Sequence, residues 1–375
     1  MTFEQKRVLQ LLAACRTAAL GGHIETCDQC GHRQPAYNSC RDRHCPKCQG
    51  AARAAWLDKR RDDLLPVDYF HVVFTIPAEL AQIALQNKSV VYGILFATAA
   101  ETLQEIAADP KHLGAQVGCL CVLHTWGQNL MHHPHVHCVV PGGGLSPDGT
   151  SWISCRPGFF LPVRVLSRVF RGKFLQRLRQ AYAAGELQFH GSLQALGTAT
   201  GFARLLHESY KKEWVVYAKP PFGGSEQVLK YLARYTYRVA ISNDRLLSLE
   251  QGQVTFRWKD YADGSRSKVM TLSADEFLRR FLLHVLPRGF VRIRHYGFLA
   301  NCHRQEKLAL CRKLLGQAAF KSALAAIAAP ESESSTESPA STCPMCGHSP
   351  MTVSEYRERP TVYDVMQLKL WDDST

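Results

Sequence analysis

The residues of this chain best suited to chemistry are two histidines separated by one valine, His135-Val136-His137. Alternate side chains of a β-strand share a face, so a strand through this segment would direct both imidazoles to one side. Neutral imidazole is a good ligand for divalent transition metals. Histidines are also dense here, because five of them lie within fourteen residues, at positions 124, 132, 133, 135 and 137. This density favours a metal site over a hydrogen-bonded structural cluster.

Cysteines in two Cys-x-x-Cys pairs, Cys27/Cys30 and Cys45/Cys48, predict a second kind of metal site. Each pair can bring two thiolates to one ion, and two such pairs near each other are typical of a tetrahedral four-thiolate zinc site. We therefore assign one structural Zn²⁺ to these four cysteines. Three neighbouring residues are spare ligands that could replace a thiolate or serve a second ion: His23, Cys40 and His44.

A third pair, Cys343/Cys346, supplies only half of a tetrahedral site. Its missing ligands come either from nearby residues or from the N-terminal cysteine module. The nearby candidates are Cys302, His303, Cys311 and His348.

Two tyrosines, Tyr231 and Tyr235, are four residues apart in a segment that we expect to form a short helix. Residues at this spacing share one helical face, with Cβ atoms roughly 5–6 Å apart. The same spacing also suits a packed aromatic stripe, so the spacing alone does not distinguish a reactive pair from a packing pair.

The composition favours a nucleic-acid partner. The chain has 375 residues, with 45 Lys and Arg against 32 Asp and Glu, a formal charge of +13. This length suggests about two or three domains, and this charge favours a polyanion, nucleic acid before a membrane surface. No cleavage signature follows the first twelve residues, and no run approaches the ~18 apolar residues of a membrane span. We expect a cytoplasmic protein with no membrane partner.

The elements that must position the histidines are predicted strands at 67–77, 117–125 and 135–141, with a helical stretch at 78–108. This order predicts an α+β sheet whose last two strands form a hairpin. In such a hairpin His124, near the end of one strand, could approach the two histidines on the next. We choose His124 as the third metal ligand, with His133 and Gln128 as alternatives.

The remaining segments are mostly basic. We expect basic helices at 1–20, 51–65 and 163–185, β hairpins at 238–275 and a helix at 274–285. The segment 288–298 mixes cations with aromatic residues, as a surface for single-stranded nucleic acid would. Residues 330–342 have the polar, low-complexity composition of a linker.

Three motifs together resemble a known family. They are the N-terminal cysteine module with its Cys-Arg-Asp-Arg-His-Cys-Pro-Lys-Cys run (40–48), then His-Thr-Trp-Gly (124–127) with His-Pro-His-Val-His (133–137), and Tyr-Leu-Ala-Arg-Tyr (231–235). In this order they resemble the two-tyrosine HUH transposases of bacterial insertion sequences, most closely the insertion sequence 91 family. The resemblance covers about residues 5 to 315.

The resemblance implies an HUH endonuclease core, a central antiparallel sheet with helices on its face, like the palm of an RNA-recognition motif, plus an N-terminal zinc-binding module. It implies rolling-circle transposition by nicking and joining single-stranded DNA at transposon ends and target. Tyr231 or Tyr235 would form a 5′-phosphotyrosine. Mg²⁺ or Mn²⁺ on His135, His137 and the third ligand would polarise the scissile phosphate.

Five segments follow from this interpretation. They are a zinc-binding, basic module (1–65), the nuclease core with the tyrosine helix (66–240), a basic β-rich part (241–325), a disordered linker (326–342) and a Cys-x-x-Cys tail (343–375). Two other functions fit parts of the pattern, a plasmid replication initiator or relaxase with the same chemistry, and a zinc-stabilised DNA-binding protein without catalysis. The motifs do not specify an oligomeric state.

Overall fold

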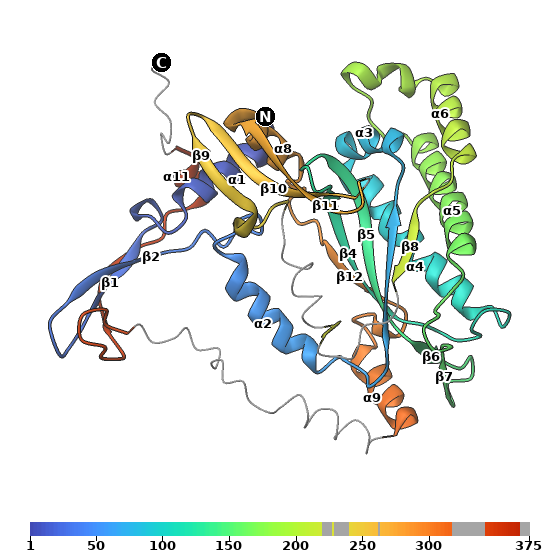
Figure 1. The fold of residues 1–375 in the computed structure, drawn as a ribbon, viewed down its shortest axis with the longest axis horizontal. Helices are drawn as coiled ribbons and strands as arrows, with labels where there is room; N and C mark the ends of the chain where they lie inside the picture. Colours follow the sequence, from blue (N-terminus) through green and yellow to red (C-terminus); the bar gives the residue numbers. More distant parts are fainter. Residues whose placement is uncertain (220–226, 229–239, 262, 317–341, 368–375) are drawn as a thin grey trace. The chain divides into compact units, whose positions relative to one another are not determined.

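The computed structural model describes residues 1–219, 227–228, 240–261, 263–316 and 342–367 (Figure 1). The chain divides into two compact units. The terminal unit comprises Met1–Asp58, Tyr237–Asn243 and Ala329–Thr375, and the central unit comprises Lys59–Thr236 and Asp244–Ala328. The predicted linker lies almost wholly outside the described residues. The cysteine tail belongs to the same unit as the N-terminal module.

The central unit is built on a five-stranded antiparallel sheet. Its strands in spatial order are β12 (Ile293–Tyr296), β4 (Cys119–Trp126), β5 (His132–Pro141), β3 (Tyr69–Thr75) and β8 (Val216–Lys219). The three strands predicted from the sequence are β3, β4 and β5, and β4 and β5 pair as the expected hairpin. The predicted α+β class with a central antiparallel sheet is therefore confirmed.

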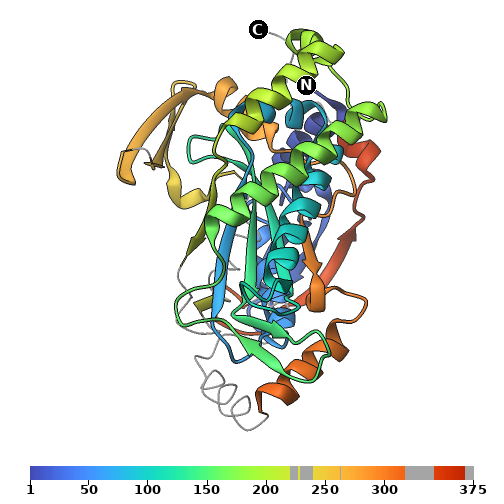
Figure 2. The ribbon, with the colours of Figure 1, turned by 90° about the vertical axis from the view of Figure 1, so that its right-hand side faces the viewer.

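Helices cover one face of this sheet, and Figure 2 shows α4 and α5 running in front of the strands. The helices of this layer are α3 (Ala78–Gln86), α4 (Lys88–Ala108), α5 (Val163–Ala183) and α6 (Ala199–Lys211). The single helix expected at 78–108 is broken at Asn87, whose side chain donates to the carbonyl oxygens of Ile83 and Gln188 at 3.1 and 2.9 Å. The break comes from this tertiary contact, about a hundred residues along the chain.

The alternation of β5 separates its side chains into two sets. Val136, Cys138 and Val140 are fully buried and pack into the helical core, together with Val72 and Phe74 of β3. His135 and His137 lie at the intervening positions, so they point to the opposite face of the sheet. The apolar half of the strand therefore anchors the sheet to the helices and directs the histidines away from them.

The rest of the central unit consists of short elements. The predicted hairpins form a three-stranded antiparallel sheet, β9 (Leu246–Glu250), β10 (Gln253–Asp260) and β11 (Arg266–Ser273). Helix α8 (Ala274–Leu283) follows and is capped by Ser273, whose hydroxyl accepts from the Glu276 N–H. The remaining elements are β6 (Gly143–Leu145), β7 (Trp152–Ser154), η2 (Gly191–Gly197), η3 (Asn243–Arg245, which begins in the terminal unit), η4 (Gly297–Leu299) and α9 (Arg304–Leu315).

The terminal unit combines segments from both ends of the chain. Its sheet has the order β13-β1-β2, so a strand from near residue 355 lies beside the first hairpin of the chain. Helix α1 starts with a capping box between Thr2 and Gln5, and α11 lies alongside it (Figure 1). The elements are α1 (Phe3–Ala14), η1 (Ala18–Leu20), β1 (Gly22–Thr26), β2 (Arg33–Tyr37), α2 (Gln49–Arg61, which runs into the central unit), β13 (Thr352–Arg357) and α11 (Val362–Gln367).

Candidate metal centres

The structure brings together the three histidines chosen from the sequence. His124 on β4 lies opposite His135 on β5, and His137 lies two residue pairs further along, on the same face. The ring centroids of His124 and His137 are 4.2 Å apart, those of His135 and His137 4.8 Å, and those of His124 and His135 5.5 Å. One nitrogen of each ring lies within 4.8 Å of the others. The three side chains therefore can share one metal ion.

Of the two alternative third ligands, His133 is not part of this group. His133 is exposed near the start of β5. Gln128 lies in the loop between β4 and β5, where its side-chain amide donates to the Tyr261 hydroxyl at 3.2 Å. The hairpin register, which sets His124 directly across from His135, favours His124 over both.

Two of the histidine rings are held at Nδ1. His135 Nδ1 lies 2.6 Å from the carbonyl oxygen of His133, and His137 Nδ1 lies 2.7 Å from His71 Nε2. A metal-binding histidine commonly donates its second ring N–H to such an acceptor, which fixes both tautomer and orientation. With Nδ1 engaged in each ring, Nε2 is the nitrogen that can bind the ion.

His71 is a residue of the site that the sequence analysis did not identify. It lies on β3, two residues from Val73, the partner of His137, and its ring stacks on that of His137 with 2° between the planes. The only sequence signal was its place within the predicted strand 67–77. The pairing of β3 with β5, which joins residues more than sixty positions apart, was needed to place it here.

Burial favours the neutral form of His71, His135 and His137. It lowers the pKa of His135 to about 4 and that of His71 to about 3, and it holds the pKa of His137 well below its usual range. For His71, the cation of Lys219 on β8 lowers the pKa further. Neutral imidazole is the form that binds a metal, so the donor set fits a divalent transition-metal ion at neutral pH.

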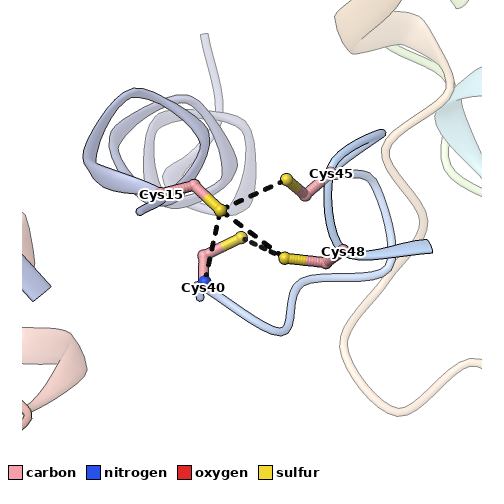
Figure 3. Close-up of side chains that lie close together, drawn as sticks. All are labelled: Cys15, Cys40, Cys45 and Cys48. Atoms are coloured by element: carbon pink, nitrogen blue, oxygen red, sulfur yellow. Dashed lines mark hydrogen bonds between the residues drawn. The ribbon is translucent and has the colours of Figure 1, made fainter. Parts of the chain in front are cut away.

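Four cysteines of the terminal unit form a first thiol cluster, Cys15, Cys40, Cys45 and Cys48 (Figure 3). Cys15 Sγ lies 3.5 Å from the Sγ atoms of both Cys45 and Cys48, and Cys40 Sγ lies 3.6 Å from Cys48 Sγ. A tetrahedral Zn²⁺ with Zn–S bonds of about 2.3 Å requires sulfurs roughly 3.8 Å apart, whereas a disulfide requires about 2.05 Å. The spacing therefore fits a four-thiolate zinc site.

A second thiol cluster contains Cys27, Cys30, Cys343 and Cys346. Cys27 Sγ lies 3.5 Å from Cys346 Sγ, and Cys30 Sγ lies 3.6 Å from Cys343 Sγ. The missing ligands of the Cys343/Cys346 pair were expected to come from nearby residues or from the N-terminal module. The structure places the N-terminal cysteines beside this pair.

The predicted joining of Cys27/Cys30 with Cys45/Cys48 on one zinc ion is wrong. Cys27 and Cys30 lie at the turn of the β1–β2 hairpin, whereas Cys40, Cys45 and Cys48 follow the open end of that hairpin. Strands of five residues separate the two ends by roughly 17 Å at about 3.3 Å per residue. Each pair therefore has other partners, and Cys40, one of the spare ligands, joins Cys45 and Cys48 in the first cluster.

The other residues near the clusters have other contacts. Cys15, which was not among the ligands expected from the sequence, caps the end of α1 and joins the first cluster. His44 Nδ1 lies 2.8 Å from an Asp42 carboxylate oxygen, and the ring of His23 stacks on Tyr356. Neither spare histidine belongs to a metal group among the described residues.

Hydrogen bonds lower the pKa of three cysteines in these clusters, whereas burial and hydrogen bonds with neighbouring thiols raise the pKa of four others, Cys15, Cys30, Cys40 and Cys346. A hydrogen bond from Cys40 lowers the pKa of the Cys45 thiol. The Cys30 backbone N–H does the same for Cys27. Burial opposes ionisation of Cys343, but the backbone N–H groups of Cys346 and Met345 bring its pKa down to about 7. Thiolate is the ligand form of cysteine.

Tyr231 and Tyr235 lie outside the described residues. The chain enters that segment from β8, whose last residue Lys219 pairs with His71 on β3. The described backbone thus leads into the tyrosine segment from a strand of the same sheet that carries the histidine group.

Comparison with known proteins identifies the family. Residues 1–76 match the family described as "Transposase zinc-binding domain", and residues 118–307 match the family described as "Putative transposase". The "Putative transposase y4qJ" of Sinorhizobium fredii (strain NBRC 101917 / NGR234) is 65% identical over 316 residues, which cover 84% of this chain and 79% of that protein. This chain belongs to the insertion sequence 91 family of transposases.

Two further similarities extend the comparison of the transposase. The "Transposase for insertion sequence element IS801" of Pseudomonas savastanoi pv. phaseolicola is 29% identical over 305 residues, 80% of this chain and 70% of that protein. A solved structure, "The structure of TrwC complexed with a 27-mer DNA comprising the recognition hairpin and the cleavage site", covers 65% of this chain and 73% of its own at 13% identity. Its TM-score of 0.23 is too low to support an argument.

The two ranges that match family models include some of the metal groups of the transposase completely and one of them only in part. The zinc-binding match contains all four cysteines of the first cluster but only two of the second, because Cys343 and Cys346 lie outside both matched ranges. The transposase match contains all three histidines and both tyrosines. Within the part of the chain that the structure describes, no helix is both long and apolar enough to cross a membrane.

Proposed function

We propose that this transposase nicks and rejoins single-stranded DNA by tyrosine attack beside a divalent ion on His124, His135 and His137. The observation that carries the proposal is the histidine group itself, three rings on one face of the sheet with Nδ1 of two of them engaged by other groups. A bound Mn²⁺ or Mg²⁺ would polarise the scissile phosphate and stabilise its developing charge. Imidazole ligands favour Mn²⁺ on affinity.

The nucleophile in this proposal is Tyr231 or Tyr235. The phenolic oxygen would bond to phosphorus as the P–O bond to the departing 3′-oxygen breaks, leaving a 5′-phosphotyrosine and a free 3′-hydroxyl once that oxygen takes up a proton. The phenol must lose its own proton, which is costly at neutral pH because the unperturbed pKa is near 10. Reversal of the same step would rejoin DNA without a nucleotide cofactor, since the phosphoester is kept. Two tyrosines would allow a second cleavage while the first adduct persists.

Charge on the same face of the sheet suits a DNA strand. Lys219 pairs opposite His71, and its ammonium group acts electrostatically on both His71 and His137. The side chain is exposed, so it can also reach a solvent-side phosphate. We assign Lys219 the role of binding the DNA backbone next to the scissile phosphate, in keeping with the charge of +13 for the whole chain.

The test is a covalent-adduct assay. Labelled single-stranded DNA carrying the end of the element is incubated with the full chain in Mn²⁺ or in chelator, and the products are separated on a denaturing gel. We expect an adduct with Mn²⁺ and none with chelator, and we expect His135→Ala/His137→Ala to abolish it. DNA that binds the chain in a native gel but never forms an adduct would instead identify a DNA-binding protein without catalysis.

A further inference from the structure

The two halves of the second thiol cluster have the same sequence pattern and the same conformation. Residues 27–32 and 343–348 both read Cys-x-x-Cys-Gly-His. In each, the first cysteine donates its backbone N–H to the carbonyl oxygen of the histidine at 2.8 Å, and the glycine N–H returns to the carbonyl of that cysteine at 2.8 or 2.9 Å. Both glycines have a left-handed φ, 70° and 73°. Two matching knuckles, more than three hundred residues apart, therefore face one another.

The four sulfur atoms of this cluster are spaced for a metal ion. The measured separations between the knuckles, 3.5 and 3.6 Å, are close to the edge of a zinc tetrahedron and far longer than a disulfide bond. Cys27 and Cys343 are buried, while Cys30 and Cys346 are exposed. Little apolar packing surrounds them, because the associated cluster of buried apolar residues contains only Cys27, Cys343 and Met351. A metal ion would supply the cohesion that this small core lacks.

The segment that carries the second knuckle is otherwise built into the terminal unit. β13 pairs along the whole of β1, and the hydroxyl oxygens of Thr26 and Ser354 lie 3.0 Å apart across that pair. The Arg359 guanidinium donates to the carbonyl oxygen of Cys40, itself a member of the first cluster, at 3.0 Å. Val365 is 1% exposed and packs with Leu11 and Ala14 of α1. This register sets the second knuckle beside the first.

We propose that the transposase binds a second Zn²⁺ through Cys27, Cys30, Cys343 and Cys346. This ion ties the segment 342–367 to the N-terminal hairpin, so the zinc module is discontinuous in sequence and is completed only after the nuclease core has been made. The ion closes a loop of more than three hundred residues, which removes conformational freedom from the unfolded chain. The proposal concerns this metal site alone and does not depend on the nuclease chemistry.

The first test uses the wild-type chain under reducing conditions. Cys302 and Cys346 are both exposed cysteines, and Cys302 belongs to no metal group among the described residues. We expect a thiol-alkylating reagent, followed by mass spectrometry, to modify Cys302 rapidly and Cys346 only after a strong chelator is added. Equal and rapid alkylation of both cysteines before chelation would overturn the proposal.

The second test counts zinc. In a His135→Ala/His137→Ala background, which removes the histidine site, the full chain should hold two Zn²⁺ by elemental analysis. Cys343→Ser/Cys346→Ser and Cys27→Ser/Cys30→Ser should each hold one, and Cys302→Ser, the matched control, should hold two. One Zn²⁺ in the parent background, or two in the Cys343→Ser/Cys346→Ser variant, would overturn the proposal. Because DNA cleavage is not measured, failure of the proposed function leaves this result unaffected.

Discussion

His71 Nε2 lies 2.7 Å from His137 Nδ1, and the two rings stack in nearly parallel planes. The contact joins β3 to β5 on the face of the sheet that carries the candidate metal ligands. Because His137 Nδ1 is engaged, Nε2 is the nitrogen that would bind the proposed ion, so we assign His71 the role of a positioning residue that acts through His137. Burial lowers the pKa of His71 to about 3, so at neutral pH it is uncharged and adds no repulsion to a bound cation.

Replacing His71 should weaken metal binding without removing a ligand. Loss of such a supporting hydrogen bond typically costs about 10–100-fold in metal affinity. We expect His71→Ala to raise the Mn²⁺ concentration needed for adduct formation by a factor in that range, and His71→Gln, which can still accept a hydrogen bond, to recover part of it. The measurement is Mn²⁺ titration of the adduct assay together with direct calorimetric titration.

The matched control for His71 is His133→Ala. The His133 side chain is exposed, and the site uses only its backbone carbonyl, which the substitution keeps. We expect Mn²⁺ affinity close to that of the wild type. If His133→Ala lowered the Mn²⁺ affinity as much as His71→Ala, the assignment of His71 as the positioning residue would be contradicted. His133 would then again be a candidate ligand.

The tyrosine pair should behave as two nucleophiles rather than one. Tyr231→Phe/Tyr235→Phe removes both phenolic oxygens, so the double variant should bind single-stranded DNA but form no adduct. Each single variant should form an adduct on one strand and fail to complete strand transfer. Band shifts in a native gel measure binding, and a denaturing gel measures the adduct. Wild-type cleavage by the double variant would rule out both residues as nucleophiles.

Cys15 should behave as a zinc ligand although it belongs to no Cys-x-x-Cys pair. Cys15→Ser removes one of four thiolates from the first cluster. Loss of a residue that only supports a ligand typically lowers metal affinity by about 10–100-fold, so the loss of this ligand should lower the zinc affinity of the site further. Competition with a chromogenic chelator measures the change. Cys155→Ser, at a half-buried cysteine of the central unit outside the metal groups, is the control. Equal zinc affinity in the two variants would exclude Cys15 as a ligand.

Acid should destabilise the central unit partly through His295. Burial, with added repulsion from Arg304 and Arg60, lowers the pKa of this side chain to about 4. The unfolded chain takes up the proton near pH 6.5, before the folded chain does. The contribution of His295 to the free energy of unfolding should therefore be complete above about pH 6.5. It should decrease toward pH 4, by at most about 1.4 kcal/mol per pH unit.

Urea unfolding at a series of pH values tests this dependence. His295→Gln, which cannot titrate in this range, should show a shallower loss of stability between pH 6.5 and 4 than the wild type. His207→Gln, at an exposed histidine of α6, should leave the slope unchanged. A slope that is the same in His295→Gln and the wild type would show that His295 does not contribute.

Local features of the chain were readable from its sequence. The His-x-His spacing and the β-branched residues around it predict a strand with two imidazoles on one face, and the short connection to the preceding strand predicts the hairpin that brings His124 to His135. The three motifs in order were enough to point to the transposase family. These features depend on residues close together in the chain, whose geometry the backbone period and turn length largely set.

Contacts between distant segments were decided only by the tertiary structure. His71 reaches His137 because β3 pairs with β5 across 66 positions, and Asn87 breaks a helix because it meets Gln188. The cysteine pairs showed the chemistry of zinc ligands but not their partners. Their division depends on the length of the β1–β2 hairpin, which holds Cys27 and Cys45 at opposite ends, and on β13, which returns Cys343 beside the hairpin turn. Whether a residue can bind a metal ion is a property of its side chain. Which residues can share one ion depends on the pairing of strands that are far apart in the chain.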